Sequence, residues 1–442
     1  MGTYKRIVLI ALPNPTMSDQ KIAPPLGLLY IAAYLKKFGY NNIEILNLPC
    51  EIENTDIAGC LNFLKDVEAD IFGISIATTQ LTYAEKICNY LKERNPQALV
   101  IIGGVHPTTL PEETLKITNA DIAVIAEGEE TFLEIVRGKS PEEIKGIAYK
   151  KDGEIINNGR RDYIKNLDVL PYPARELIDF SKYTRTLGGE PCTNLITARG
   201  CPFNCVFCDQ DIWQRKVRYF STEYVLGEVD DIKKKTGIDK LLFLDDTLTL
   251  NRERIIDIAK GLKKRSVEWR GWTRADTVDL ELLKIMKEGG CQSLCIGAES
   301  GSDKILKNIK KGVTTEQNLQ AVKWVKESEM MVRVSLIVGS PGETEETIEE
   351  TKKFMVSAHP DDWIVSTFVP VVGSDAWRNP DRYGIKITAK SYDEFFVVGY
   401  DEESGSVMEY DNLSGNEILG MKKDLIGFLN QYVPRKPEEV VK

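Results

Sequence analysis

The sequence predicts an α/β protein built on two sheets, and three observations support this fold class. Short, continuously apolar runs alternate with helical patterns over the first 140 residues, as in a parallel sheet buried on both faces. The same alternation returns from residue 193. The length of 442 residues suits two or three domains of roughly 150 residues each. We therefore predict a doubly wound, Rossmann-like parallel sheet, then a partial (β/α)6 barrel of the TIM type, then a small C-terminal appendage.

The first predicted sheet has about five strands. The run KRIVLIAL at 5–12 is the first strand, and the helix at 25–38 ends before Gly39, where a left-handed residue can terminate it. The other elements follow as strand 43–46, helix 57–67, strand 70–76, helix 83–94, strands 99–102 and 121–125, and helix 129–136. This domain is predicted to cover residues 1–140.

Loops after these strands are candidate ligand contacts, because ligands of such sheets bind beyond the carboxyl ends of the strands. The candidates are Thr78, Thr79 and Gln80 in one loop, Gly103, Gly104 and His106 in a second, and Glu127, Gly128 and Glu129 in a third. Paired glycines let a ligand approach the backbone closely. Each loop also has an ordinary interpretation, since Gly-Gly and Gly-Glu serve as turns and helix starts.

Residues 141–190 are predicted as a linker that contains a hairpin around Asp152 and Gly153. The partial barrel covers 191–370, with strands at 194–198, 240–244, 269–273, 291–297, 332–338 and 363–368. Six β/α units are two short of a complete barrel, so one side should be open. The appendage at 371–442 includes GYDEESGSVMEYDNLSGNE and a final helix near 417–429, and its fold is not predicted.

Composition excludes several classes of protein. The chain is 42% hydrophobic and 28% charged, which argues against collagen, low-complexity disorder and a disulfide-held mini-protein. The net charge of −10 disfavours a nucleic-acid partner. No apolar run approaches the roughly eighteen residues of a membrane helix, and the first residues lack a signal-peptide pattern. We expect a cytoplasmic protein without a membrane span.

The spacing of the cysteines is more informative than their number. Nine cysteines are an odd number and do not suggest a disulfide framework. Cys201, Cys205 and Cys208 follow the first barrel strand at spacings of four and three residues, so their thiols can converge on one iron–sulfur cluster. Three thiolates on a four-iron cluster leave one iron open to a substrate. A zinc site without its fourth ligand, or incidental buried cysteines, are the alternatives.

This Cys-x-x-x-Cys-x-x-Cys loop, with Phe207 before its third cysteine, resembles the defining motif of the radical S-adenosylmethionine (radical SAM) superfamily. The resemblance covers about residues 190–370. It implies a 4Fe-4S cluster on Cys201, Cys205 and Cys208, whose open iron chelates S-adenosylmethionine. One electron then cleaves the sulfonium to a 5′-deoxyadenosyl radical. Phe207 would lie near the adenine.

Other barrel residues resemble contacts to S-adenosylmethionine. Asp245 and Asp246 stand where the superfamily usually has Gly-Gly-Glu, and they resemble the Asp-Asp version of members with a cobalamin domain. Capping of the helix near Asn251 is the alternative. Glu299 resembles the residue that holds the ribose or methionine end, or else it caps the helix at Ser302.

The fifth barrel strand supplies two more candidates. Arg333 and Ser335 share one of its faces, which points into the barrel or forms an exposed edge. Gly339 then leads into the segment SPGET, which resembles the adenine-side turn of the superfamily. The helix that follows has an acidic first turn suited to its dipole.

With this core downstream, residues 1–140 are similar to the cobalamin-binding domain of cobalamin-dependent radical SAM proteins. PPLGLLYIAAYL, the polar loop after Ile76, GGVHPT and AEGEET carry this resemblance in that order. It implies that the three candidate loops bind cobalamin. The loop after the first strand reads PNPTMS, without the Asp-x-His-x-x-Gly of many cobalamin proteins. We therefore expect no histidine on cobalt, residues 77–80 under its lower face, and easier release of a methyl radical.

The combined resemblance implies a cobalamin-dependent radical SAM C-methyltransferase. The 5′-deoxyadenosyl radical would remove hydrogen from an unactivated carbon, and methylcobalamin would supply the methyl group. A cyclase or rearranging enzyme is one alternative, and a non-catalytic cobalamin-binding sensor or carrier is another. A flavodoxin or ferredoxin is expected as electron donor. The substrate stays open among small molecules, lipids, peptides and protein side chains.

Overall fold

The computed structural model describes residues 5–209, 211–395 and 405–435. The chain forms two compact units, Met1–Thr184 with Asp211–Gln214, and Arg185–Gln210 with Arg215–Lys442. Each unit contains its own seven-stranded sheet. Within the described ranges, every helix is too short or too polar to cross a membrane.

The sheet of the first unit has the order β2-β1-β3-β4-β5-β6-β7. Five strands pair in parallel: β2 (Ile43–Asn47), β1 (Ile7–Ala11), β3 (Ile71–Ile76), β4 (Leu99–Gly104) and β5 (Ile122–Val124). The hairpin of β6 (Ile147–Lys151) and β7 (Glu154–Asn157) adds to β5 in antiparallel direction. The Rossmann-like sheet is confirmed, and this hairpin comes from the segment predicted as a linker.

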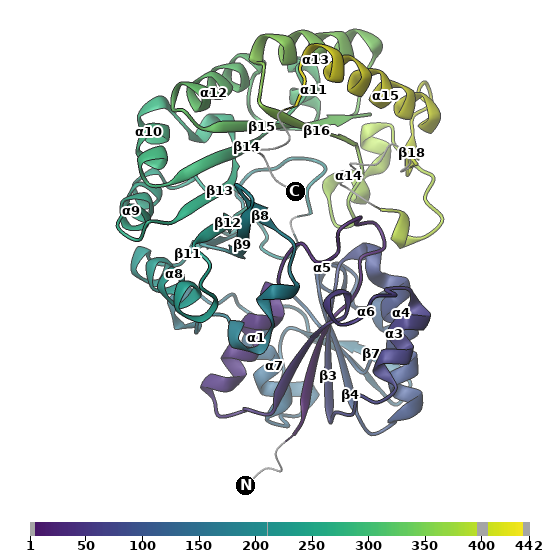
Figure 1. The fold of residues 1–442 in the computed structure, drawn as a ribbon. Coiled ribbons are helices and arrows are strands. Elements are labelled where there is room, and N and C mark those ends of the chain that lie inside the picture. Colours follow the sequence, from purple (N-terminus) through teal and green to yellow (C-terminus); the bar gives the residue numbers. More distant parts are fainter. Residues whose placement is uncertain (1–4, 210, 396–404, 436–442) are drawn as a thin grey trace. The chain divides into compact units, whose positions relative to one another are not determined.

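Helices cover both faces of this sheet (Figure 1). On one face α1 (Leu26–Lys37) packs against α7 (Glu129–Val136), and on the other α4 (Leu81–Arg94) packs against α3 (Ile57–Leu64) and α6 (Pro111–Thr118). Short helices follow three strands, namely α2 (Leu48–Glu51), η1 (Thr78–Gln80) and α5 (Val105–Thr109). The sequence did not predict α6, because eight residues are too few to show helical periodicity.

Parallel strands buried on both faces explain the apolar runs of the sequence. Ile7, Val8, Leu9 and Ile10 are all fully buried. Gly39, at a φ of +89°, follows the end of α1 as predicted. The chain beyond β7 has little regular structure, with short turns η2 (Pro141–Glu143), η3 (Leu167–Val169), η4 (Arg175–Leu177) and η5 (Phe180–Lys182).

The sheet of the second unit has the order β16-β15-β14-β13-β12-β9-β8. Six strands pair in parallel with one another: β9 (Glu190–Leu195), β12 (Lys240–Phe243), β13 (Glu268–Thr273), β14 (Cys291–Glu299), β15 (Met331–Val338) and β16 (Asp362–Thr367). The edge strand β8 (Thr186–Leu187) is antiparallel. The sheet curls without closing, which confirms the partial barrel (Figure 1).

Helices line the outer, convex face of this half-barrel (Figure 1). They are α8 (Thr222–Thr236), α9 (Arg252–Lys263), α10 (Leu280–Glu288), α11 (Asp303–Asn308), α12 (Thr315–Glu327) and α13 (Glu345–Ala358). Short elements lie in the loops, namely β10 (Ala198–Arg199), β11 (Arg218–Tyr219) and η6 (Ala275–Thr277). Side chains of alternate strand residues therefore face either these helices or the concave interior.

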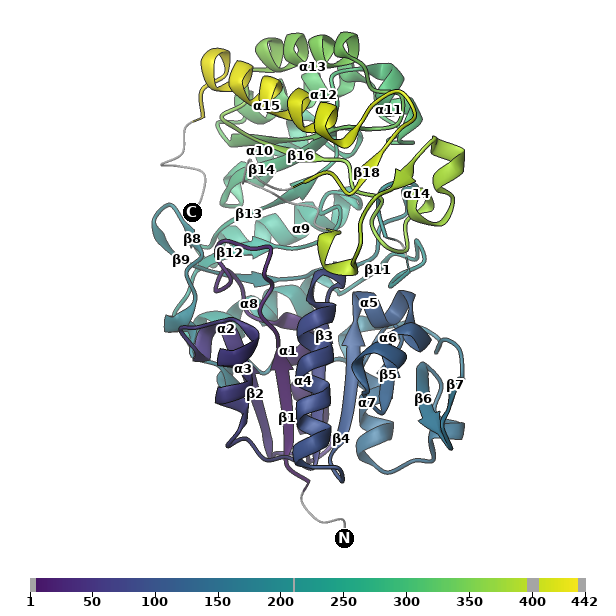
Figure 2. The same cartoon turned by 90° about the vertical axis from the view of Figure 1, so that its right-hand side faces the viewer.

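The C-terminal appendage packs onto the half-barrel (Figure 2). It contains α14 (Asp375–Arg378), η7 (Pro380–Tyr383), β17 (Lys386–Ile387), η8 (Tyr392–Glu394), β18 (Met408–Glu409) and α15 (Gly415–Tyr432). The helix predicted near 417–429 is α15, which lies against α13 and β16. Part of the predicted 399–417 segment, residues 399–404, lies outside the described residues.

Candidate cofactor sites

The carboxyl edge of the first sheet has a topological switch point between β1 and β3, because the chain continues from β1 to β2 on one side and to β3 on the other. Crevices at such points bind ligands in doubly wound folds. Gln80 ties the two loops together, since its Nε2 donates to the Leu12 carbonyl at 2.7 Å and to the Pro13 carbonyl at 3.2 Å. Thr79 Oγ1 donates to Asn14 Oδ1 at 3.2 Å.

His106 lies in α5, after β4, and is fully buried. Its Nδ1 is 3.3 Å from the Thr78 hydroxyl oxygen. Burial lowers the pKa of His106 to about 4, so the imidazole is neutral at neutral pH. Thr78 and His106 thus place uncharged hydrogen-bonding groups in the loops after β3 and β4.

Gly104 is required where it stands. Its φ is +107°, and a Cβ there would lie 2.4 Å from the Ile76 carbonyl oxygen, so only glycine lets β4 pair with β3 to its end. A Cβ on Gly103 would meet Val124 at 3.6 Å, an ordinary contact. Thr108 Oγ1 accepts from the Ala126 N–H at 2.9 Å, which joins this loop to the next one.

The loop after β5 begins α7. Gly128 is the N-cap residue of α7, which is the ordinary interpretation given above. The Glu127 carboxylate accepts from the Ile164 N–H at 2.9 Å, and Glu129 is buried in the first turn of α7. Glu127 thus holds the chain beyond β7 against this loop.

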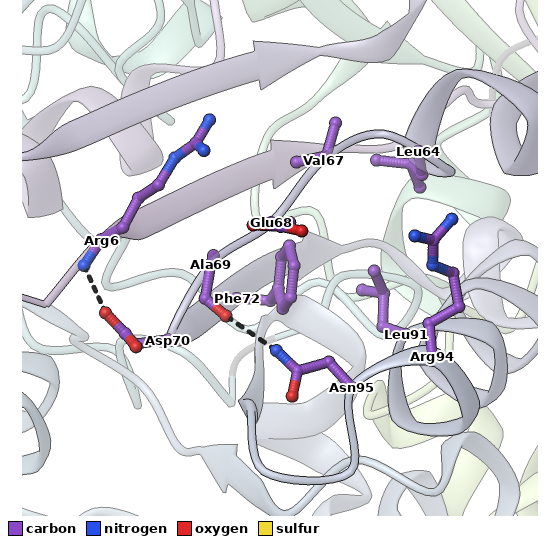
Figure 3. Close-up of a pocket in the computed structure, with 10 residues that line it drawn as sticks. All are labelled: Arg6, Leu64, Val67, Glu68, Ala69, Asp70, Phe72, Leu91, Arg94 and Asn95. Atoms are coloured by element: carbon purple, nitrogen blue, oxygen red, sulfur yellow. Dashed lines mark hydrogen bonds between the residues drawn. The ribbon is translucent and has the colours of Figure 1, made fainter.

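A separate pocket of about 390 Å³ lies at the amino ends of β1 and β3 (Figure 3). Arg6, Asp70 and Arg94 lie on its polar side, and Phe72 and Leu91 supply apolar surface. It lies at the opposite end of the strands from the candidate loops, and none of its lining residues was predicted as a site residue.

In the second unit, Cys201, Cys205 and Cys208 lie on the loop after β10. The backbone of this loop is anchored on both sides: the Val206 N–H donates to the Ile309 carbonyl at 3.0 Å, and the Val206 carbonyl accepts from the Ala376 N–H at 2.9 Å. The anchor at Ala376 belongs to α14, so the appendage helps to position the cysteines.

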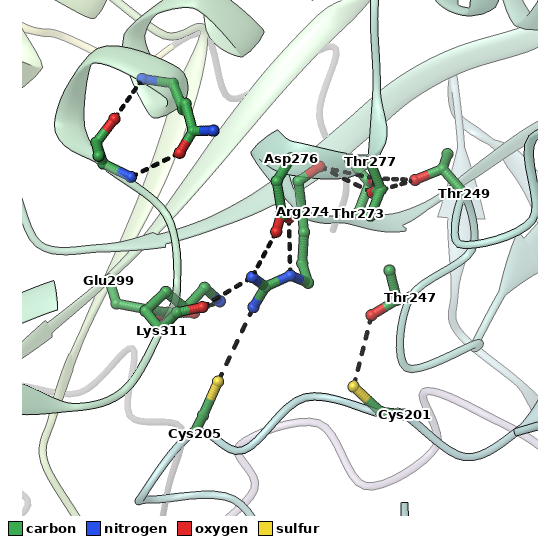
Figure 4. Close-up of polar contacts among 12 residues, drawn as sticks. Cys201, Cys205, Thr247, Thr249, Thr273, Arg274, Asp276, Thr277, Glu299 and Lys311 are labelled. Atoms are coloured by element: carbon green, nitrogen blue, oxygen red, sulfur yellow. Dashed lines mark hydrogen bonds and ion pairs between the residues drawn. The ribbon is translucent and has the colours of Figure 1, made fainter. Parts of the chain in front are cut away.

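The three thiols are not equivalent. Cys205 and Cys208 share a hydrogen bond, whereas Cys201 Sγ lies 3.8 Å from Thr247 Oγ1 (Figure 4). Across residues 5–209, 211–395 and 405–435, no three His, Cys, Asp or Glu side chains are grouped as metal ligands. Phe207 packs edge-on against Phe368, with ring centroids 6.3 Å apart.

Buried charges surround Cys205 (Figure 4). Arg274 Nη1 lies 4.0 Å from Cys205 Sγ, and Asp276 fixes the guanidinium with two hydrogen bonds of 2.9 Å. The hydrogen bond from Cys208, helped by Lys311 and Arg274, lowers the pKa of Cys205 to about 7. The same hydrogen bond raises the pKa of Cys208, and burial raises that of Cys201.

Glu299 ends β14 in a left-handed conformation, with a φ of +65°. Its carboxylate pairs with Lys311 Nζ at 2.7 Å, and both side chains are buried. The Lys311 carbonyl accepts from Arg274 Nη2 at 2.7 Å. A Cβ on Gly297 would lie 2.5 Å from Glu299 Oε1, so glycine leaves room for the carboxylate.

Asp245 and Asp246 play different parts. The buried Asp245 carboxylate accepts from the backbone N–H groups of Thr197 and Ala198, at 2.5 and 3.1 Å, and so holds the start of the cysteine loop. Asp246 is exposed to solvent, yet partial desolvation and the neighbouring Asp245 charge raise its pKa to about 6. Asn251 caps α9, so neither aspartate has the capping role considered above.

The fifth-strand candidates lie on β15 and the turn after it. Arg333 pairs with Asp362 of β16, and Ser335 is half-buried. Gly339 has a φ of +87°, its N–H donates to the buried Glu343 carboxylate, and its carbonyl accepts from Tyr410 at 2.8 Å. Burial raises the pKa of Glu343 to about 7.

Sequence reasoning missed Arg274, Asp276, Lys311 and Thr247. Arg274 stands one residue after a predicted strand, at the carboxyl end, and its position could have identified it. Lys311 lies in a loop with no periodicity or spacing to mark it.

Comparison with known proteins supports both units. The model of the radical SAM superfamily matches residues 195–355, and the model of the B12 binding domain matches residues 18–136. An uncharacterized methyltransferase of Pyrococcus horikoshii is 35% identical over 384 residues, 84% of this chain and 82% of that protein. The anaerobic magnesium-protoporphyrin IX monomethyl ester cyclase of Rubrivivax gelatinosus is 27% identical over 429 residues, 93% of this chain and 75% of that protein.

The fold has a solved counterpart in the radical S-adenosylmethionine methyltransferase TsrM from Kitasatospora setae, described with cobalamin and a 4Fe-4S cluster bound. The TM-score is 0.74 at 16% identity, over 98% of this chain and 93% of TsrM. A Rossmann-like sheet joined to an open β/α barrel with a three-cysteine loop is the architecture of a radical SAM enzyme with a cobalamin domain. The chain belongs to this cobalamin-dependent branch of the radical SAM superfamily, and the predicted resemblance is confirmed.

Proposed function

We propose that the protein is a C-methyltransferase that acts on an unactivated carbon. When bound, the 4Fe-4S cluster, S-adenosylmethionine and cobalamin supply reductive cleavage to a carbon-centred radical and a transferable methyl group. The carbon of the substrate exchanges a hydrogen for a methyl group. A first S-adenosylmethionine leaves as 5′-deoxyadenosine and methionine, a second leaves as S-adenosylhomocysteine, and a low-potential donor such as a flavodoxin or ferredoxin supplies electrons.

The observation that carries this proposal is the cysteine loop at the carboxyl end of the half-barrel, downstream of a B12-binding domain. Cys201, Cys205 and Cys208 would hold the cluster. The low pKa of Cys205 fits an iron ligand, because the thiolate is the binding form. Arg274 and Lys311 stabilise the negative charge of this thiolate.

Two acids would orient S-adenosylmethionine. Asp246 is accessible at the end of β12 and can pair with the ammonium group, while Asp245 positions the loop beside it. Glu299, fixed by Lys311, can accept hydrogen bonds from hydroxyl groups. Phe207, Arg333, Ser335 and Gly339 stay predicted cofactor contacts from the neighbouring elements.

Cobalamin would lie over the switch point of the first unit, against the loops of Thr78–Gln80 and of Gly103 and Gly104. Residues 77–80 contain no imidazole, and His106 has its Nδ1 at Thr78. Cobalamin bound to the protein should therefore give a cob(II)alamin electron paramagnetic resonance spectrum without axial nitrogen splitting. Splitting that disappears in His106→Ala would contradict this placement.

Product analysis distinguishes methyl transfer from ring formation. The reduced protein, loaded with cluster and cobalamin, is incubated with S-adenosylmethionine carrying a CD3 group and with a metabolite extract. Methyl transfer should give 5′-deoxyadenosine and S-adenosylhomocysteine in equal amounts, and a product heavier by one CD3. The Cys201→Ala, Cys205→Ala, Cys208→Ala triple variant is the control.

The similarity to the Rubrivivax cyclase favours ring formation as the second candidate. A cyclase would give 5′-deoxyadenosine without matching S-adenosylhomocysteine, because no methyl group is consumed. A non-catalytic sensor or carrier would give neither product. The substrate, whether small molecule, lipid, peptide or protein side chain, follows from the labelled product.

A further inference from the structure

The concave face of the half-barrel holds a buried arginine, Arg270, that the cofactor assignments leave unused. Arg270 on β13 is 7% exposed, and Arg333 on β15 lies near it. They help to line a cavity of about 20 Å³, room for one water-sized group. Its lining consists of Leu242, Arg270, Gly271, Trp272, Ser293, Leu294, Cys295 and Arg333.

Strand alternation fixes the direction of Arg270. The preceding residue, Trp269, packs against Phe243 with ring centroids 5.1 Å apart, and its indole N–H donates to the Gly289 carbonyl at 2.8 Å. These contacts place Trp269 on the helix side of the sheet. Because successive residues of a strand point to opposite faces, Arg270 and Trp272 face the concave interior.

Arg270 has no counter-charge within the described parts of the chain. Its Nε is buried and makes no hydrogen bond. Burial, together with the positive charges of Arg185 and Arg333, lowers the pKa of Arg270 to about 10. Arg270 is therefore a cation at neutral pH, and a buried cation without a partner costs several kcal/mol.

The acid beside Arg333 is already engaged. Asp362 pairs with Arg333 and also lies 3.8 Å from Arg435 Nε. One carboxylate thus faces two guanidinium groups before Arg270 is counted. Arg270 thus keeps a buried positive charge that an anion would balance.

We propose that the Arg270–Arg333 cavity binds an anionic group of the substrate, a carboxylate or a phosphate. This inference rests on the proposed function, for which it names the substrate class. One oxygen of the anion fits the cavity and accepts hydrogen bonds from Arg270, and the hydroxyl of Ser293 can donate another. The fork of a guanidinium suits both carboxylate and phosphate oxygens.

The position along β13 limits the shape of the substrate. Arg274, which contacts Cys205, lies four residues beyond Arg270, about 13 Å at a rise of roughly 3.3 Å per residue. A molecule anchored at Arg270 must extend along the interior to present its reacting carbon at the carboxyl end of the barrel. The substrate is therefore an elongated acid whose reacting carbon lies several bonds from the anionic group.

Anion titration of the full-length protein tests this site. Inorganic phosphate or butyrate replaces chloride at constant ionic strength, and tryptophan fluorescence and the thermal midpoint are recorded, since Trp272 lines the cavity. At least one anion should give a saturable response, weakened about tenfold or more in Arg270→Met. Arg265→Met removes an arginine that pairs with Asp230 at the surface, and should bind as the wild type does.

Arg270→Lys controls for misfolding of Arg270→Met, because lysine keeps the positive charge but lacks the paired N–H donors of a guanidinium. It should weaken anion binding less than Arg270→Met does. Unchanged affinity in both variants would overturn the proposal. The absence of a saturable response in the wild type would also overturn it. Equally tight binding of chloride at this site would do the same, because the bound anion would then be an adventitious ion only. The titration needs no cluster or cobalamin, so wild type that binds anions but transfers no CD3 would contradict the proposed function alone.

Discussion

The carboxyl edges of the two sheets use polar side chains in opposite ways. In the first unit the loops are joined by uncharged groups, such as Gln80 on the Leu12 carbonyl and neutral His106 beside Thr78. In the second unit Arg274, Lys311 and Glu299 are buried as charges around one thiol. The same α/β architecture thus builds a cradle of uncharged groups after β1, β3 and β4 in one unit, with buried carboxylates in the loop after β5, and a charged pocket in the other. The difference matches the proposed cofactors, a large macrocycle held by shape and a cluster with S-adenosylmethionine held by charge.

The largest expected effect concerns the charged pocket. Cys201→Ala, Cys205→Ala and Cys208→Ala together should abolish both the iron–sulfur absorbance and the formation of 5′-deoxyadenosine, because no thiolate would remain on this loop. Cobalamin binding should persist, since the two units have separate cores. Iron content, visible spectra and product analysis provide the measurements.

Cys88→Ala is the matched control for this triple variant, because Cys88 is a fully buried cysteine of the first unit. It should keep the cluster. A full cluster in the triple variant would contradict the assignment of these ligands, and loss of cobalamin in it would contradict the independence of the two edges.

The buried pair of Lys311 and Glu299 gives the next largest effect. Lys311→Met leaves an unpaired buried carboxylate, which should lower the free energy of unfolding by about 3–5 kcal/mol. Urea unfolding followed by tryptophan fluorescence reports mainly on the second unit, since every tryptophan except Trp213 belongs to it.

An exposed pair supplies the control. Lys263 and Glu288 lie 3.1 Å apart with side chains 59% and 67% exposed, so Lys263→Met should cost no more than about 1 kcal/mol. The Lys311→Met, Glu299→Met double variant should lose less than the two single losses added together. Equal losses in Lys311→Met and Lys263→Met would show that burial adds nothing at this site.

The sequence predicted the two sheets because their strands are buried on both faces and appear as apolar runs. The predicted strand at 240–244 is β12 (Lys240–Phe243), and the one at 332–338 is β15 (Met331–Val338). The short helix α6 left no such signal. The appendage was also beyond prediction, because α14 and β17 are too short for periodicity and α15 is positioned by contacts with α13 and β16.

The sequence likewise revealed some residues of the candidate sites and not others. The spacing of Cys201, Cys205 and Cys208 is local in sequence and marked the loop directly. The partner of Glu299 is Lys311, twelve positions later in an irregular loop, and the arginine at Cys205 directly follows β13. Such pairings depend on how the strands are arranged in space, so hydrophobic periodicity carries no information about them.

The buried histidine of the first unit, His106, should make the stability of that unit depend on pH. The pKa of folded His106, about 4, lies below the ordinary value near 6.5, so the unfolded chain binds the proton first as the pH falls. The free energy of unfolding should be unaffected above pH 7 and fall by about 3 kcal/mol between pH 6.5 and 4.

His106→Gln should remove this part of the pH dependence, whereas His359→Gln should retain it, because His359 is exposed at the end of α13. Hydrogen exchange of peptides from β3 and β4 measures the stability of the first unit at each pH. Parallel curves for the wild type and His106→Gln would mean that folding does not lower the pKa of this imidazole.

The smallest expected effect tests whether shape forms the cradle of the first unit. Gly104→Ala places a methyl group 2.4 Å from the Ile76 carbonyl oxygen at a φ of +107°, which should cost about 2 kcal/mol and separate the ends of β3 and β4. Gly153→Ala has a φ of +83° but nothing within 4 Å of the new methyl group, so it should show the backbone strain alone, about 1 kcal/mol. Hydrogen exchange of β3 and β4 and the affinity for cobalamin measure both variants. If shape holds the cofactor, Gly104→Ala should weaken cobalamin binding and leave formation of the 4Fe-4S cluster intact. Equal cobalamin affinity in Gly104→Ala and the wild type would instead place the cofactor away from the junction of these two strands.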